Sequence, residues 1–351
     1  MTTSLLPDLW FLILALAFYV YVVLDGFDLG IGILTLLNRD PGYRLASIQA
    51  IHGVWHANQT WLVVVGAGLL AAFPLAYGVI LAALILPVGL MLLGLIGRGV
   101  ALEYHYFLAE KDGWSAWVFG AGSLLAASAQ GLGLGTLLLG LPVEDGRFAG
   151  GVWHWVAPLP LIGAAGLPVL YALLGATRMT AKTEGPHQAF SRRASFPAAC
   201  LSLAAAAALL LWGFAARPAW SRDWLSRPKG FVTLLPLALA VLTLAALVFL
   251  SRSGRDRRTP FALAAGSVFL VFLGLVSGFH PNIVLPDVSI AQAAADPLVL
   301  KVMLAGFCVI LPIVFIYTVY MYRVFGARIQ EVRPMDGNPP AERVGGGPHI
   351  A

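Results

Sequence analysis

Long apolar runs dominate this sequence and limit the folds that it can adopt. Each run is about 20 residues long, enough for an α-helix that rises 1.5 Å per residue to cross the roughly 30 Å hydrocarbon core of a bilayer. None of the runs alternates polar with apolar residues, as the strands of a membrane β-barrel do. Hydrophobic residues make up 59% of the chain and charged residues only 11%, unlike a soluble domain. We therefore predict an all-α, polytopic membrane protein.

Short polar segments separate the apolar runs and set the number of spans. The first run follows no Lys or Arg and precedes no cleavage site, so we expect a retained helix rather than a signal peptide. Residues 331–351 are rich in Pro and Gly, which predicts a disordered tail behind a single transmembrane domain over 1–330. We predict about nine transmembrane helices, at residues 8–37, 51–73, 76–97, 115–140, 156–176, 197–216, 231–250, 260–280 and 300–323.

Basic residues are distributed unevenly between the two sides of the predicted bundle. With an odd number of spans, the loops on the side of the C-terminus hold most of the Arg and Lys residues, among them Arg178 and Lys182. The positive-inside rule then places the C-terminus in the cytoplasm and the N-terminus outside. Segment 217–230 is the exception, because its four basic residues fall on the outer side. No basic patch with stacking aromatic residues indicates a nucleic-acid partner.

Two carboxylates interrupt the first apolar run. Asp25 and Asp28 are three residues apart, which places them on one face of a helix. A charged carboxylate at mid-membrane costs about 2.5–3.5 kcal/mol, so the pair must face protein, water or a proton donor rather than lipid. Gly26, Gly30 and Gly32 offer positions where a neighbouring helix can approach closely. The pair fits either a face that conducts protons or compensates charge, or a structural hydrogen-bonding site between helices.

A second polar group opens the next run, in "IHGVWHANQTWL" at 51–62. His52 and His56 have the i, i+4 spacing that can supply two metal ligands or line a proton path on one helix face. Asn58 and Gln59 are supporting polar residues. The sequence nearby lacks a third ligand, so we predict no metal site. Trp61 fits a packing aromatic or an interfacial anchor equally well.

Further polar residues are scattered through the other spans. Arg98, Glu103 and His105 are expected to compensate one another as a solvated cap, although Glu103 could also open a route inward from the cytoplasm. Gln130 is expected to form a hydrogen bond between helices. Cys200 and Cys308 lie in apolar runs, which predicts small buried side chains without a disulfide. No hydrolase, phosphate-binding or dinucleotide-binding motif occurs, which leaves proton, electron or solute movement as candidate functions.

The chain resembles subunit II of the cytochrome bd type quinol oxidases, including their cyanide-insensitive branch. The resemblance rests on the acidic motif of the first helix and on the W-x-x-N-x-x-W pattern of Trp55, Asn58 and Trp61. The matching stretches are "LDGFDLGIGIL" (24–34), "VWHANQTWLVVVGAGLLAAFPLAY" (54–77), "GRGVALEY" (97–104), "FHPNIVLPDVSI" (279–290) and "LPIVFIYTVYMYRVFG" (311–326).

This resemblance implies a heterodimer in the bacterial inner membrane. A partner, subunit I, would carry two b-type haems and one d-type or b-type haem, oxidise quinol and reduce dioxygen to water with protons from the cytoplasm. The present chain would form two four-helix bundles and one peripheral helix. It would bind no haem and contain no catalytic residue. A structural quinone or lipid and a small accessory single-helix subunit are further possibilities that the family raises.

The resemblance also assigns roles to individual residues. Asp25 and Asp28 match the acidic residues of the family's first helix, and Trp61 matches a tryptophan near a lateral oxygen route in some members. His56 departs from the pattern, because its position is normally Asp or Glu on the proton path. Histidine can relay protons, but as a cation it cannot neutralise a positive group. The path then depends more on Asp25, Asp28 and Glu103, or lies mainly in the partner.

Two other functions stay open at the level of the sequence. A proton-coupled secondary transporter would also keep carboxylates within the membrane, and its substrate site would lie on broken helices in matching halves. Pro87, Pro168 and Pro312 interrupt predicted spans, but without a matched pair of halves. A membrane scaffold without any proton path is the third alternative.

Overall fold

The computed structural model describes residues 5–104, 114–216, 229–253 and 259–325, and these residues are almost entirely helical. The long helices are α1 (Leu5–Leu37), α3 (Trp55–Ala72), α5 (Ile85–Tyr104), α6 (Trp114–Leu139), α7 (Pro158–Lys182), α8 (Gly185–Ala216), α10 (Lys229–Ser253), α11 (Thr259–Phe279) and α13 (Pro297–Phe325). Short helices are α2 (Pro41–Ile51), α4 (Pro74–Ala83) and α12 (Ile290–Ala293). The predictions for His105, most of segment 217–230 and the tail at 331–351 lie outside the described residues.

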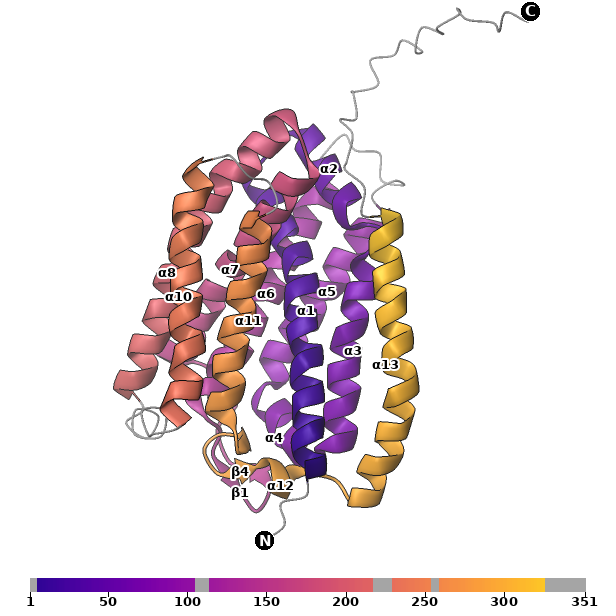
Figure 1. Cartoon of the computed structure of the whole chain (residues 1–351), viewed down its shortest axis with the longest axis vertical. Coiled ribbons are helices and arrows are strands. Elements are labelled where there is room, and N and C mark those ends of the chain that lie inside the picture. Colours follow the sequence, from indigo (N-terminus) through magenta and orange to yellow (C-terminus); the bar gives the residue numbers. More distant parts are fainter. Residues whose placement is uncertain (1–4, 105–113, 217–228, 254–258, 326–351) are drawn as a thin grey trace, which may run out of the picture.

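Eight of these helices are long and apolar enough to cross a membrane, within the described part of the chain. Helix α3 falls short of the same hydropathy because its first turns carry His56, Asn58 and Gln59. Its 18 residues nevertheless run beside α1 and α13 through the bundle (Figure 1). With α3 included, the described residues agree with the prediction of about nine spans in an all-α membrane protein.

One predicted span divides into two helices. The run at 76–97 covers α4 without its first two residues and the first part of α5, and the two helices are separated at Leu84. Pro87 lies in the first turn of α5 and has no N–H to donate to the carbonyl of Ala83, so a continuous helix is not favoured there. Helix α5 then continues to Tyr104, about two turns beyond the predicted end. Pro168 and Pro312 do lie inside long helices, as expected.

Helix α1 stands near the middle of the bundle, between α11 and α3 in this view (Figure 1). It packs mainly on α3, α6 and α7. The most extensive contacts between long helices join α5 to α6, α6 to α7, α7 to α8 and α10 to α11, and α1 packs on both α6 and α7. Helix α13 lies at one edge against α3 and α1, so it corresponds to the expected peripheral helix.

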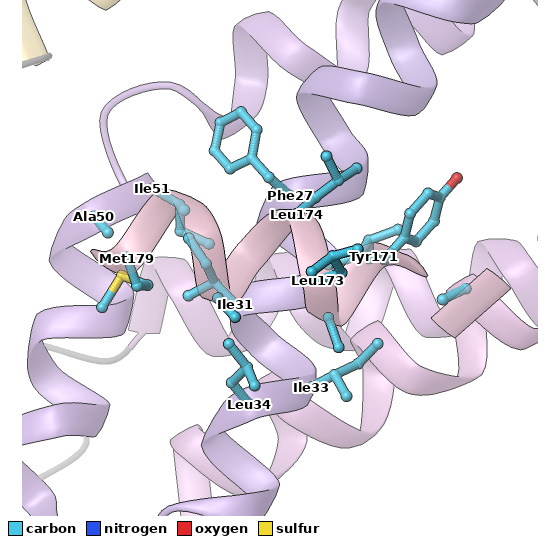
Figure 2. Close-up of a cluster of buried hydrophobic side chains, with 14 of the residues drawn as sticks. Phe27, Ile31, Ile33, Leu34, Ala50, Ile51, Tyr171, Leu173, Leu174 and Met179 are labelled. Atoms are coloured by element: carbon cyan, nitrogen blue, oxygen red, sulfur yellow. The ribbon is translucent and has the colours of Figure 1, made fainter. Parts of the chain in front are cut away.

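Small side chains allow α1 and α7 to come very close. A Cβ atom on Gly30 would overlap the backbone carbonyl of Tyr171, and one on Gly175 would overlap the backbone of Gly30. Around this crossing, side chains of α1 and α7, among them Phe27, Ile31 and Leu174, belong to one buried hydrophobic cluster (Figure 2). Close backbone approach of this kind maximises dispersion contacts between membrane helices, where no hydrophobic effect drives association.

The two ends of the bundle are closed by short elements. Strands β1 (Val143–Glu144) and β2 (Arg147–Phe148), and β3 (Asn282–Val284) and β4 (Val288–Ser289), form two hairpins at the end where α1 begins. Helix α12 lies at the same end, whereas α2 covers the opposite end (Figure 1). The Trp10 indole N–H donates to the carbonyl of Leu300, at 3.1 Å, which ties the first turns of α1 to α13.

Candidate functional site

Both carboxylates of α1 are fully buried, with no exposed side-chain surface. They lie beyond the midpoint of the helix, where three or more neighbouring helices surround it. Asp25 and Asp28 therefore face protein rather than lipid, as their cost in hydrocarbon requires.

Arg98 of α5 is the partner of Asp25. Its Nη2 donates to Asp25 Oδ1 at 2.7 Å, and neither side chain is exposed. A bond this short between a guanidinium and a carboxylate is the charge-assisted kind. The prediction that Arg98 belongs to a solvated cap with Glu103 is wrong, because α5 extends about two turns past it and carries the guanidinium into the interior. Its position well inside an apolar helix was the signal in the sequence.

Close packing of α5 on α6 brings Arg98 to this depth. A Cβ atom on Gly94 would overlap the backbone of Gly122 and Ala126, and one on Gly122 would overlap the backbone of Gly94 and Arg98. These glycines allow the two backbones to touch, which places the guanidinium beside α1 rather than a side-chain length away. Gly94, one helical turn before Arg98, therefore helps to position the guanidinium in the site.

Asp28 belongs to a hydrogen-bond network with two other helices. Asn58 Nδ2 of α3 donates to Asp28 Oδ2 at 2.8 Å and to the carbonyl of Leu24 at 3.2 Å. The hydroxyl of Tyr322 in α13 donates to Asn58 Oδ1 at 3.0 Å. Asn58 is fully buried, so the amide is held from both sides and orients the carboxylate.

The buried charges leave polar atoms without a protein partner. Among the described residues, Asp25 Oδ2, Asp28 Oδ1 and two nitrogens of Arg98, Nε and Nη1, make no hydrogen bond. Each buried polar atom in this condition costs about 1–3 kcal/mol unless water or a proton satisfies it. Arg98 pairs with Asp25, whereas Lys182 acts on Asp28 without a direct bond, because its Nζ donates to the carbonyls of Ala50 and Phe325. The site is suited to take up a proton, because a proton on Asp28 would neutralise a carboxylate that has no paired cation.

A second polar chain starts one turn before Asp25. Gln130 of α6 donates through Nε2 to the Tyr21 hydroxyl at 2.7 Å and accepts from the Tyr171 hydroxyl at 2.8 Å. The prediction that Gln130 forms a hydrogen bond between helices is confirmed, and its amide links α1 with α7. Tyr21 and Asp25 share a face of α1, so this chain extends the polar interior away from Asp28.

His56 and Glu103 pair with one another at the surface, away from the buried carboxylates. His56 Nε2 lies 3.3 Å from Glu103 Oε1, and the two side chains are 64% and 49% exposed. The His56 ring also stacks on Trp55 with a centroid distance of 3.7 Å. An exposed pair of this kind contributes at most about 1 kcal/mol to stability. The structure does not bring these two residues into contact with Asp25 or Asp28.

The predicted pairing of His52 with His56 on one helix face is wrong. His52 caps the end of α2, whereas His56 belongs to the first turn of α3. The chain turns at residues 52–54, so the i, i+4 spacing does not apply. Within the described ranges, no three His, Cys, Asp or Glu side chains gather in a way that could hold a metal ion.

Trp61 is a packing residue in this structure. It is 4% exposed, packs with Ala17 and Tyr21, and its Nε1 donates to Thr318 Oγ1 of α13 at 3.3 Å. Of the two interpretations open from the sequence, packing therefore holds and an interfacial anchor does not. Gln59 is partly exposed on α3. A role of Trp61 near an oxygen route stays a prediction.

The cysteines differ from their expected burial. Both are free, as predicted, but Cys308 is exposed and Cys200 is partly exposed. Cys308 lies on α13, and its exposure follows from the peripheral position of that helix, most of whose surface contacts no other part of the described chain.

The family model of cytochrome bd terminal oxidase subunit II matches residues 6–325. The chain belongs to this family. A cytochrome bd ubiquinol oxidase subunit 2 from Bacillus subtilis (strain 168) is 30% identical, over 94% of this chain and 98% of that protein. A cytochrome bd-I ubiquinol oxidase subunit 2 from Escherichia coli (strain K12) is 24% identical, over 93% of this chain and 96% of its own length.

A solved structure of bd oxidase from Geobacillus thermodenitrificans has the same fold as this subunit II. It superimposes with a TM-score of 0.75 at 17% sequence identity, over 92% of this chain and 99% of the matched chain. The relatives named above are subunits of quinol oxidases, and nothing in these similarities supports the alternative of a proton-coupled transporter.

Proposed function

We propose that this chain is the haem-free second subunit of a bacterial quinol oxidase and that it works only with a haem-bearing subunit I. The partner would hold the b-type and d-type, or only b-type, haems, oxidise quinol and reduce dioxygen to water. Support comes from membership of the subunit II family and from relatives named as ubiquinol oxidase subunits. The surface position of His56, paired with Glu103, also makes it a poor axial ligand for a buried haem in this chain.

The partner would cover the face made by α3, α5 and α13. Helix α13 is the least buried of the candidate spans, with 6% of its most apolar window buried. The three helices also carry side chains of the network around the α1 carboxylates: Arg98 of α5 bonds to Asp25, Asn58 of α3 bonds to Asp28, and Tyr322 of α13 bonds to Asn58. A subunit on this face would lie one helix layer from Asp25 and Asp28. Charge changes at its haems would act on the network over that short distance.

The proposed role of the network is to hold and deliver protons. The observation that carries it is the buried pair of Arg98 and Asp25 beside Asp28, whose Oδ1 has no partner among the described residues. His56 and Glu103 would admit protons from the cytoplasmic side, which lies at the end of the bundle that carries Arg192, Arg193 and Arg323. An oxygen route beside Trp61 and a small accessory single-helix subunit remain expectations of the same proposal.

The test uses the assembled complex, purified with its partner. Asp28→Asn keeps the shape of the side chain and its contact with Asn58 but removes the site that binds a proton. We expect intact haem spectra, at least a tenfold loss of quinol-driven oxygen consumption on the scale of general acid–base effects, and a matching loss of proton uptake in vesicles.

Asp8→Asn is the matched control, because Asp8 is a carboxylate of the same helix that contacts His280 at its other end, 3.5 Å away. It should leave both rates unchanged. Unchanged turnover and proton uptake in an assembled Asp28→Asn complex would reject the proton role and leave a structural hydrogen-bonding site. A colourless chain that purifies without a partner would reject the oxidase itself.

A further inference from the structure

An apolar groove lies away from the buried Arg98, and no residue of the network around Asp25 lines it. Helices α1, α6, α7 and α8 line it, and its volume is about 590 Å³. Sixteen residues form its wall, and only Ser128 and Arg193 among them are polar. The exposed side chains of Leu37, Leu124 and Leu201 mark where it opens to the surroundings. A groove with this lining excludes small polar solutes and favours a hydrocarbon chain.

The groove lies near the arginine-rich end of the bundle and runs into the membrane. Its wall on α8 extends from Phe190 to Leu201, which corresponds to roughly 16 Å along a helix. That length is close to half of the roughly 30 Å hydrocarbon core, or one leaflet. An acyl chain aligned with the helices would therefore fit within it, with its headgroup at the membrane surface.

A single cation stands at the headgroup end. Arg193 is exposed, lines the groove and has no acidic partner among the described residues. No Asp or Glu lines the groove either. An anion at this position would meet a guanidinium that can bind a phosphate through two parallel hydrogen bonds. A zwitterionic or neutral headgroup would gain much less.

Two prolines add hydrogen-bond acceptors to the same wall. Pro168 in α7 and Pro197 in α8 have no N–H to donate to the carbonyls of Ala164 and Arg193, four residues earlier. All four residues line the groove. The carbonyl of Arg193, at the headgroup end of the groove, thus lacks the backbone donor of a regular helix and could accept a hydrogen bond from a glycerol hydroxyl.

We propose that this groove binds one anionic phospholipid, with an acyl chain between α7 and α8 and its phosphate on Arg193. The lipid would fill the space between α1, α6, α7 and α8 on the arginine-rich side of the membrane. This site is independent of the proton-handling role, because it shares no residue with the network around Asp25.

Native mass spectrometry of the purified complex tests the proposal, with phosphatidylglycerol and phosphatidylcholine added as probes. Arg193→Gln should lower phosphatidylglycerol occupancy about fivefold, on the scale of one basic residue acting on an anionic lipid. Arg192→Gln is the matched control, since Arg192 is an exposed neighbour on the same helix that does not line the groove. It should leave occupancy unchanged.

A second pair of variants tests the apolar part of the site. Ala165 is exposed and lines the groove, so Ala165→Phe should fill it without disturbing the core and displace the lipid while Arg193 is intact. Ala204→Phe, at an exposed position of α8 outside the groove, should not. The proposal would be overturned if Arg192→Gln and Arg193→Gln lost phosphatidylglycerol equally, or if the parent complex retained phosphatidylcholine as well as phosphatidylglycerol. It would also be overturned if Ala165→Phe bound phosphatidylglycerol as well as the parent, or if inorganic phosphate alone displaced the lipid. Oxygen consumption does not enter this test, so its failure leaves the proposed function untouched.

Discussion

Replacing Asp25 by Asn should destabilise the protein more than almost any other change of similar size. The Arg98 guanidinium has no exposed surface, and Asp25 Oδ1, at 2.7 Å, is its side-chain partner in the structure. Its Nε and Nη1 already lack partners among the described residues. Asp25→Asn therefore leaves a buried cation without a counter-charge. Removal of one partner from a buried ion pair costs about 3–5 kcal/mol.

The reverse substitution should cost less, and the double substitution least. Arg98→Gln leaves a buried carboxylate, which can become neutral by binding a proton, whereas a guanidinium does not lose one. The variant with both Asp25→Asn and Arg98→Gln contains no buried charge at this position, and we expect it to lie within about 1–2 kcal/mol of the parent. Because the double variant costs less than either single variant, the coupling energy of the double-mutant cycle should be at least the cost of Asp25→Asn alone, about 3–5 kcal/mol.

Unfolding of the purified complex in mixed detergents, followed by tryptophan fluorescence, measures these differences. Glu103→Gln is the control, because it breaks an exposed pair on the same helix as Arg98 and should cost no more than about 1 kcal/mol. If Asp25→Asn proves as stable as Glu103→Gln, the buried pair does not contribute in the way that its geometry implies. A stable double variant that consumes oxygen at the parent rate would show that the pair is structural only.

Two further substitutions test the packing of α1 and the order of the network. Gly30→Ala should lower the free energy of unfolding by about 1–3 kcal/mol, because the new methyl group would overlap the carbonyl of Tyr171 and neither backbone can move easily. Gly78→Ala is the control and should leave stability unchanged, because a Cβ atom there would meet nothing within 4 Å. Equal thermal stability of the two variants would contradict this prediction. Tyr322→Phe removes the hydroxyl that donates to Asn58 and should lower the free energy of unfolding by about 1 kcal/mol. It should also slow oxygen consumption in a complex with normal haem spectra. An unchanged rate would place that hydroxyl outside the proton-handling network.

Much of the architecture follows from local sequence. Hydrophobic length alone predicts the spans, because a helix must cover a fixed thickness of hydrocarbon. The chemistry of Asp25 and Asp28 dictates that they face protein, since lipid offers no partner for a carboxylate. Gly30 likewise indicates a close helix crossing, and the structure places the backbone of Tyr171 against it. Membership of the subunit II family also follows from the motif around Asp25 together with Trp55 and Asn58.

The partners of the carboxylates were decided by the tertiary structure. Arg98 is 73 residues from Asp25, and Tyr322 is 264 residues from Asn58, so no pattern along the chain connects them. Hydropathy says how deep a residue lies but not which way its helix is rotated. That rotation depends on contacts such as Gly94 against Gly122, which turn Arg98 toward α1 and leave Glu103 outside. The sequence therefore identifies the charged residues of this site, whereas the packing of the helices determines which of them form pairs.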